Sequence, residues 1–180
     1  GVAAAMAVLQ AKDLQHGPIE ALFTIDEETG MTGAFGLKPG LLDGDILLNL
    51  DSEDEGEIYV GCAGGIDANI TYTYKTENTP SNSTSYKISL IGLKGGHSGM
   101  EIILGRGNAN KLMNRFLKYA DKKLHARIAH IDGGSLRNAI PRESFAVITV
   151  PQELEKDFIA AIKEFEHIYK NEYANTEPDL

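Results

Sequence analysis

The sequence predicts an α/β part over residues 1–62 with a parallel sheet, and an α+β part over residues 63–180 with an antiparallel sheet and two helices on one face. Residues 21–25 and 46–50 are hydrophobic at nearly every position, which is typical of strands covered on both faces, as in a parallel sheet. After a glycine-rich joint, residues 66–74 alternate apolar and polar side chains, which indicates a half-exposed antiparallel strand. The change of pattern places the domain boundary between residues 62 and 63.

The composition limits the class of protein. With 42% hydrophobic and 24% charged residues among 180, the sequence is that of a globular chain. Its formal charge of 17 − 26 = −9 disfavours nucleic acid and anionic membranes as partners. The single cysteine, Cys62, excludes an internal disulfide framework and fits a reducing compartment. Because no apolar run approaches the length of a membrane span, we expect a cytoplasmic protein that binds neither nucleic acid nor membrane.

The predicted helices and strands differ in order between the two parts. In the first part they alternate, as a parallel sheet requires: a buried helix over 2–14, a strand over 19–25, a short helix within 30–42, and strands over 46–50 and 57–62. In the second part, periodicity predicts strands over 66–74, 86–90, 127–131 and 145–150, and helices over 104–124 and 154–169. This second order predicts a small sheet with helices on one face.

Carboxylates follow both hydrophobic strands of the first part. Asp26, Glu27 and Glu28 follow residues 21–25, and Asp51 follows residues 46–50. Because the carboxyl ends of parallel strands open on one edge of the sheet, we expect these side chains to converge on one crevice. There, one carboxylate can hold a divalent cation while its neighbour deprotonates a metal-bound water. The alternative is an acidic turn that is simply solvated.

A histidine lies on a glycine-flanked loop of the second part, Gly95-Gly96-His97-Ser98-Gly99. Such a histidine can reach over a cleft and stabilise the oxyanion of a tetrahedral intermediate. The alternative is an exposed loop histidine. Ser98 is disfavoured as a nucleophile, because Met100 stands where the nucleophile-elbow pattern needs its last glycine.

A polar stretch that joins two predicted strands contains Arg137, Asn138 and Arg142. Asn138 offers both a donor and an acceptor, and an arginine can clamp a substrate carboxylate in bidentate fashion. These residues are therefore candidates for substrate binding. A polar turn before Pro141 is the alternative.

Five stretches taken in order resemble the di-zinc amidohydrolases that include aminoacylases, carnosinases and related dipeptidases. They are residues 23–31, 49–54, 61–65, 92–99 and 133–143. The last three are similar to the bacterial aminoacyl-histidine (Xaa-His) dipeptidase branch. The likeness covers essentially the whole chain. It implies part of a zinc-peptidase catalytic domain followed by a lid domain.

The resemblance also implies an activity and a role for each candidate residue. The activity is hydrolysis of Xaa-His dipeptides such as carnosine through a zinc-activated water, in an enzyme with two zinc ions that forms a homodimer through the lid. By this resemblance Glu27 is the general base, and Glu28 and Asp51 are zinc ligands. His97 stabilises the oxyanion, and Asn138, Arg137 and Arg142 contact the substrate.

The ends of the sequence suggest an excised piece of a longer enzyme. The chain begins within a helix pattern that has no N-cap residue, and it stops directly after an amphipathic helix. By the resemblance, an upstream His-x-Asp motif, an Asp just before Gly1 and a distal His are missing. We therefore expect this chain to bind zinc poorly and to be inactive alone. The alternative function is a non-catalytic lid or dimerisation module.

Overall fold

The structure is a computed structural model that describes residues 1–51, 54–62 and 64–180. The motif around Asp51 extends over residues 52 and 53, and the predicted second domain begins at residue 63. These three positions lie outside the described residues. The chain divides into two compact units, Gly1–Thr71 and Tyr72–Leu180. The predicted boundary after residue 62 stays a prediction.

The second unit is built on a three-stranded antiparallel sheet with the order β1-β5-β3. The strands are β1 (Ser83–Leu90), β3 (Arg127–Gly133) and β5 (Ser144–Pro151). They confirm the strands predicted over 86–90, 127–131 and 145–150. The most hydrophobic strand, β5, takes the central position. There, β1 and β3 pair with its two edges, and the helices cover one of its faces.

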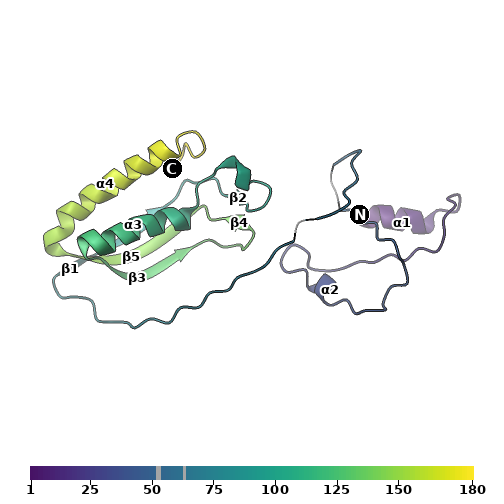
Figure 1. The fold of residues 1–180 in the computed structure, drawn as a ribbon, viewed down its shortest axis with the longest axis horizontal. Helices are drawn as coiled ribbons and strands as arrows, with labels where there is room; N and C mark the ends of the chain where they lie inside the picture. Colours follow the sequence, from purple (N-terminus) through teal and green to yellow (C-terminus); the bar gives the residue numbers. More distant parts are fainter. Residues whose placement is uncertain (52–53, 63) are drawn as a thin grey trace. The chain divides into compact units, whose positions relative to one another are not determined.

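Two long helices, α3 (Ala109–Leu124) and α4 (Glu155–Glu172), run alongside this sheet (Figure 1). The Asn108 side chain caps the start of α3 by accepting a hydrogen bond from the Lys111 N–H at 3.1 Å. The helix ends at His125, which takes the left-handed conformation with φ of 51°. Both helices confirm the periodicity of their sequences, although α3 begins later than predicted.

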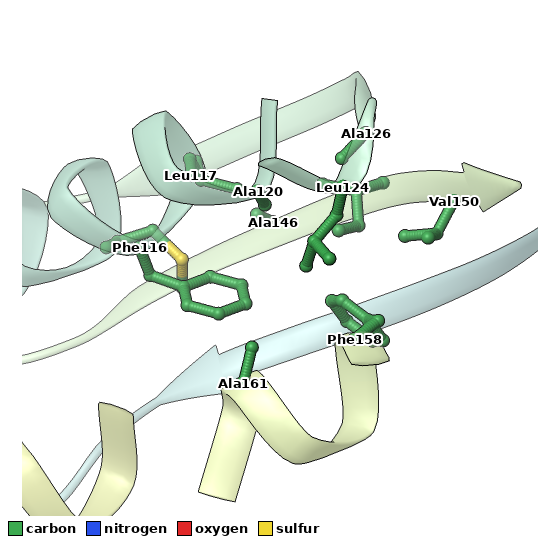
Figure 2. Packing of buried hydrophobic residues seen from close by; sticks show 11 residues of the cluster. Phe116, Leu117, Ala120, Leu124, Ala126, Ala146, Val150, Phe158 and Ala161 are labelled. Carbon is green, nitrogen blue, oxygen red and sulfur yellow. The ribbon is translucent and has the colours of Figure 1, made fainter. Parts of the chain in front are cut away.

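The core lies between one face of the sheet and both helices. Alternate residues of β5, namely Ala146, Ile148 and Val150, are fully buried on that face. Figure 2 shows side chains from both helices in the same cluster, among them Phe116 of α3 and Phe158 of α4. The two rings lie 6.1 Å apart between centroids. The predicted antiparallel sheet with two helices on one face is therefore confirmed.

A two-stranded ribbon and two short 3₁₀ helices complete the second unit. Strand β2 (Gly96–His97) pairs antiparallel with β4 (Ala139–Ile140). The 3₁₀ segments are η1 (Ile102–Leu104), which follows the ribbon, and η2 (Gln152–Leu154), which leads into α4. The ribbon holds together two loops that the sequence singles out for chemistry.

The described residues of the first unit form two helices, α1 (Val2–Gln10) and α2 (Thr32–Phe35). No strand forms among its described residues, so the strands predicted over 19–25, 46–50 and 57–62 are wrong for this structure, as is that over 66–74. A strand needs a hydrogen-bonded neighbour. These segments have no strand partner in the described part of the chain, and Ile46 is 83% exposed.

The helix predicted over 2–14 is shorter than expected and is exposed, with Val2 at 61% and Leu9 at 51%. None of its nine residues is buried. None of the helices in the ranges that the structure describes is long and apolar enough to cross a membrane.

The core predicts the effect of a mutation in α4. Phe158→Ala should lower the free energy of unfolding by about 3–5 kcal/mol, because it removes a buried ring and leaves a cavity. Ile159→Ala is the matched control, since its side chain is 44% exposed and should cost much less. Urea unfolding of the chain, followed by helix circular dichroism, measures both. Equal losses of unfolding free energy in the two variants would contradict the burial of Phe158 in the core.

A buried tyrosine links α3 and α4 and makes stability depend on alkaline pH. The Tyr169 hydroxyl donates to the Leu112 carbonyl at 2.8 Å, and burial raises the pKa of Tyr169 from 10.0 to about 12. Because the folded state holds this proton more tightly, the stabilisation is complete below pH 10 and is lost as the pH rises toward 12.

Replacing this tyrosine should therefore reduce the pH dependence. The free energy of unfolding of Tyr169→Phe should fall less steeply between pH 10 and 12 than that of the wild type. Tyr74→Phe is the control, because Tyr74 is 75% exposed and the variant should keep the wild-type slope. Urea titrations at several pH values measure the free energy of unfolding of the wild type and both variants. If Tyr169→Phe shows the same pH dependence as the wild type, the buried Tyr169 hydroxyl is not the cause of that dependence.

Candidate functional site

The acidic turn of the first unit is shaped by its first carboxylate. Asp26 takes the left-handed conformation with φ of 62°, and its main-chain oxygen accepts from the Met31 N–H at 2.6 Å. Its side chain accepts from the hydroxyls of Thr29 and Thr32, the latter at 2.8 Å. Asp26 is thus engaged within its own turn. This role separates it from Glu27 and Glu28, which are exposed on the same turn.

Asp51 ends the second predicted strand of the first unit and is exposed. Its N–H donates to the Asn49 side chain at 3.0 Å. Upstream, the Glu20 carboxylate accepts from the N–H groups of Asp43 and Gly44 at 2.8 and 2.9 Å. A side chain therefore ties the segment before Asp26 to the segment before Asp51, where a strand ladder was predicted.

The expected crevice of acids does not form by itself. In the described ranges, no three His, Cys, Asp or Glu side chains come together in a way that could hold a metal ion. Carboxylate oxygens such as those of Glu28 and Asp51 suit zinc chemically, but a zinc site needs three or four protein ligands. These two residues alone do not make one.

The start of the chain lies beside the end of the segment that carries Asp51. A Cβ atom added to Gly1 would lie 3.5 Å from the main-chain oxygen of Leu50. The first turn of α1 therefore contacts the residue that directly precedes Asp51.

In the second unit, the structure brings two predicted site residues together. His97 of β2 pairs with Ala139 of β4, and the Ser98 N–H donates to the main-chain oxygen of Asn138 at 2.8 Å. His97 is thus in the ribbon, and Asn138 is in the turn directly before β4, bonded to the residue after His97. Gly95 is required here because its φ is 68° and a Cβ atom would lie 3.1 Å from the Ile140 oxygen.

Backbone hydrogen bonds orient the His97 imidazole. Its Nδ1 accepts from the N–H groups of Gly99 at 3.0 Å and Met100 at 3.2 Å. Because Nδ1 accepts, the proton of the neutral ring lies on Nε2. Gly99 permits this close approach, since a Cβ atom there would lie 3.2 Å from the ring. The exposed ring therefore offers an N–H donor.

Two charged residues that the sequence analysis missed hold the loop around His97. The Glu101 carboxylate accepts from the His97 N–H at 2.7 Å and pairs with Arg106 at 2.9 Å. Arg106 also donates to the Gly95 carbonyl. The hydrogen bond from the His97 backbone, together with the Arg106 charge, lowers the pKa of Glu101. The signal available in the sequence was an opposite-charge pair within a glycine-bounded loop.

The predicted arginines lie on either side of β4. Arg137 precedes the strand next to Asn138, and Arg142 follows it. Arg142 is exposed and pairs weakly with Glu143 at 3.4 Å. The ribbon therefore gathers His97, Asn138 and both arginines along one short stretch, while the candidate acids belong to the other unit.

Comparison with known proteins defines the class of the chain. Residues 88–177 match the peptidase dimerisation domain of the M20 family, and the chain belongs to that family. The matched residues run from the end of β1 through α4 and include His97 and Asn138. The resemblance noted from the motifs is confirmed at this level.

Two relatives match the chain over its full length. It is 49% identical over 180 residues to the cytosol non-specific dipeptidase of Escherichia coli (strain K12), of which it covers 37%. It is also similar to the crystal structure of aminoacylhistidine dipeptidase from Vibrio alginolyticus. The TM-score is 0.71 at 46% identity, with 99% of this chain and 36% of that one covered. The chain thus spans little more than a third of the length of each relative.

The imidazole geometry can be tested by NMR. At a pH where His97 is neutral, we expect its proton on Nε2 and a scalar coupling across the hydrogen bond between Nδ1 and the Gly99 amide nitrogen. His130, on the exposed strand β3, provides the internal control and should show no such coupling. A protonated Nδ1 in neutral His97 would contradict the assignment.

Proposed function

We propose that this chain is part of a cytoplasmic, zinc-dependent dipeptidase that hydrolyses Xaa-His dipeptides such as carnosine. The observation that supports this most strongly is the full-length match to two dipeptidases, one of them an aminoacylhistidine dipeptidase, at 49% and 46% identity. The single cysteine and the net charge of −9 agree with a cytoplasmic enzyme.

Glu27 acts as the general base in this proposal. The carboxylate of its neighbour Asp26 is hydrogen-bonded within the turn, whereas the Glu27 side chain is exposed on that turn. A carboxylate in that position accepts the proton of the attacking water and returns it to the leaving amine. Zinc, when bound, supplies a Lewis acid and makes water a stronger acid near neutral pH.

Glu28 and Asp51 are the zinc ligands that this chain contributes. A further aspartate ligand, which the resemblance places just before Gly1, would stand close to Asp51, because Gly1 itself lies against Leu50. The two carboxylates are fewer than a zinc ion needs, so the remaining ligands come from parts of the enzyme outside this chain. Alone, the chain is then a weak zinc binder and is inactive.

His97 and Asn138 act on the substrate from the dimerisation domain. The Nε2–H of His97 is a suitable donor for the negative oxygen that develops during attack on a peptide carbonyl. Asn138, in the turn directly before β4, offers a donor and an acceptor to the peptide. Arg137 and Arg142 can hold the substrate carboxylate.

The same unit mediates homodimer formation. In the described sheet, β1 and β3 are outer strands, and each has one edge without a strand partner. The apolar side chains of Ile128 and Ile131 on β3 are 52% and 50% exposed. An exposed strand of this kind can pair with a second copy, which agrees with the description of the family as a dimerisation domain.

A second candidate is a dimerisation module without activity of its own. It is favoured by one observation: the hydrophobic clusters of the described residues lie in the second unit. The two proposals differ in what the first unit does. Only the dipeptidase proposal requires Glu27 for turnover in the full-length protein.

Glu27→Gln in the full-length enzyme tests the proposal. It should lower kcat for carnosine by about 10²-fold or more, because general acid–base catalysis is worth about 10²–10⁴-fold. Glu55→Gln, another exposed acid of the first unit, is the matched control and should keep its activity. A zinc chelator should abolish turnover, whereas a serine-reactive reagent should have no effect. Full activity of Glu27→Gln would refute the assigned base.

A further inference from the structure

A buried carboxylate lies behind the loop that carries His97. Glu177 is 1% exposed, and its two oxygens accept hydrogen bonds from the N–H groups of Lys94 and Gly107, both at 2.8 Å. None of the ion pairs among the described residues involves Glu177. Burial of a carboxylate is costly unless its hydrogen bonds compensate, so these two N–H groups account for its placement.

The two donors are the ends of one segment, residues 94–107, which we call the His97 loop. A single carboxylate therefore holds both ends of this loop together. Gly107 makes room for the contact, because a Cβ atom there would lie 2.7 Å from the Leu93 side chain and 3.6 Å from Cγ of Glu177. Within the loop, Glu101 and Arg106 fix the backbone next to His97.

The turn that carries Glu177 is itself fixed to the end of α4. The N–H groups of Thr176 and Glu177 donate to the Tyr173 carbonyl at 3.0 and 2.8 Å. Tyr173 follows the last residue of α4, and Tyr169 is bonded to the Leu112 carbonyl of α3. A continuous set of contacts thus runs from the core helices through Glu177 to both ends of the His97 loop.

We propose that Glu177 is a positioning residue for His97: it holds the ends of the His97 loop so that the imidazole is presented to the substrate in one orientation. This inference rests on the proposed role of His97 in the dipeptidase. Glu177 itself contacts no substrate in this proposal. Its effect passes through the backbone of the loop.

The kinetic test uses the full-length enzyme. Glu177→Gln keeps the size of the side chain but places an amide N–H against one of the two donors. We expect kcat to fall about tenfold or more while KM changes much less, since small misplacements of a catalytic group cost up to about 10²-fold. Glu172→Gln, which breaks the exposed pair of α4 with Arg115, is the matched control and should change kcat less than about twofold.

A double-mutant cycle separates positioning from general stability. If Glu177 acts through His97, Glu177→Gln should have little further effect on kcat in a His97→Ala background. An undiminished effect in that background would overturn the proposal. If Glu177→Gln does not fold, Glu177→Asp, whose shorter side chain retains the charge, takes its place in the same cycle.

A spectroscopic readout on the 180-residue chain is independent of activity. Glu177→Gln should shift the His97 imidazole nitrogens and weaken the coupling between Nδ1 and the Gly99 amide, whereas Glu172→Gln should change neither. Unchanged His97 signals in Glu177→Gln would overturn the inference. If His97→Ala alone leaves kcat intact, the proposed role of His97 is wrong, while this readout still decides whether Glu177 controls the loop.

Discussion

The structure of the second unit depends on the burial of one sheet face beneath α3 and α4. The central strand offers Ala146, Ile148 and Val150, and aromatic side chains of both helices close over them. Because β1 pairs with β5 along its whole length, this core also fixes the point at which the chain leaves the sheet toward the His97 loop. The buried core therefore sets where the loop begins, and polar contacts within the loop orient the exposed imidazole.

The two units are organised by different kinds of contact. Hydrophobic packing dominates the second unit. The carboxylates of Glu101 and Glu177 in that unit accept hydrogen bonds from backbone N–H groups. In the first unit, the described carboxylates make polar contacts with the main chain and with hydroxyls: Asp26 closes its own turn, and Glu20 bonds to the backbone of Asp43 and Gly44. Apolar segments such as the one around Ile46 remain exposed.

The sequence predicted the parts of the fold whose packing partners lie within the same unit. Strands β1, β3 and β5 and both long helices follow from periodicity, since each packs against another element of the same unit. The predicted parallel strands failed because continuous apolar runs indicate burial without identifying the neighbour that provides it. His97 and Asn138 were predicted from their residue types and the motifs around them. Glu177 was missed because its partners are backbone N–H groups far away in the sequence, which no residue pattern reveals. The charge pair of Glu101 with Arg106 was visible in the sequence but was not recognised.

The bonds of Glu177 span long stretches of sequence, 83 residues to Lys94 and 70 to Gly107. During synthesis on the ribosome, the glycine-rich segment around His97 is therefore made long before the carboxylate that closes it. Until the turn after α4 emerges, the nascent chain lacks the carboxylate that bonds to both Lys94 and Gly107. The histidine consequently acquires its final geometry among the last events of translation of this domain.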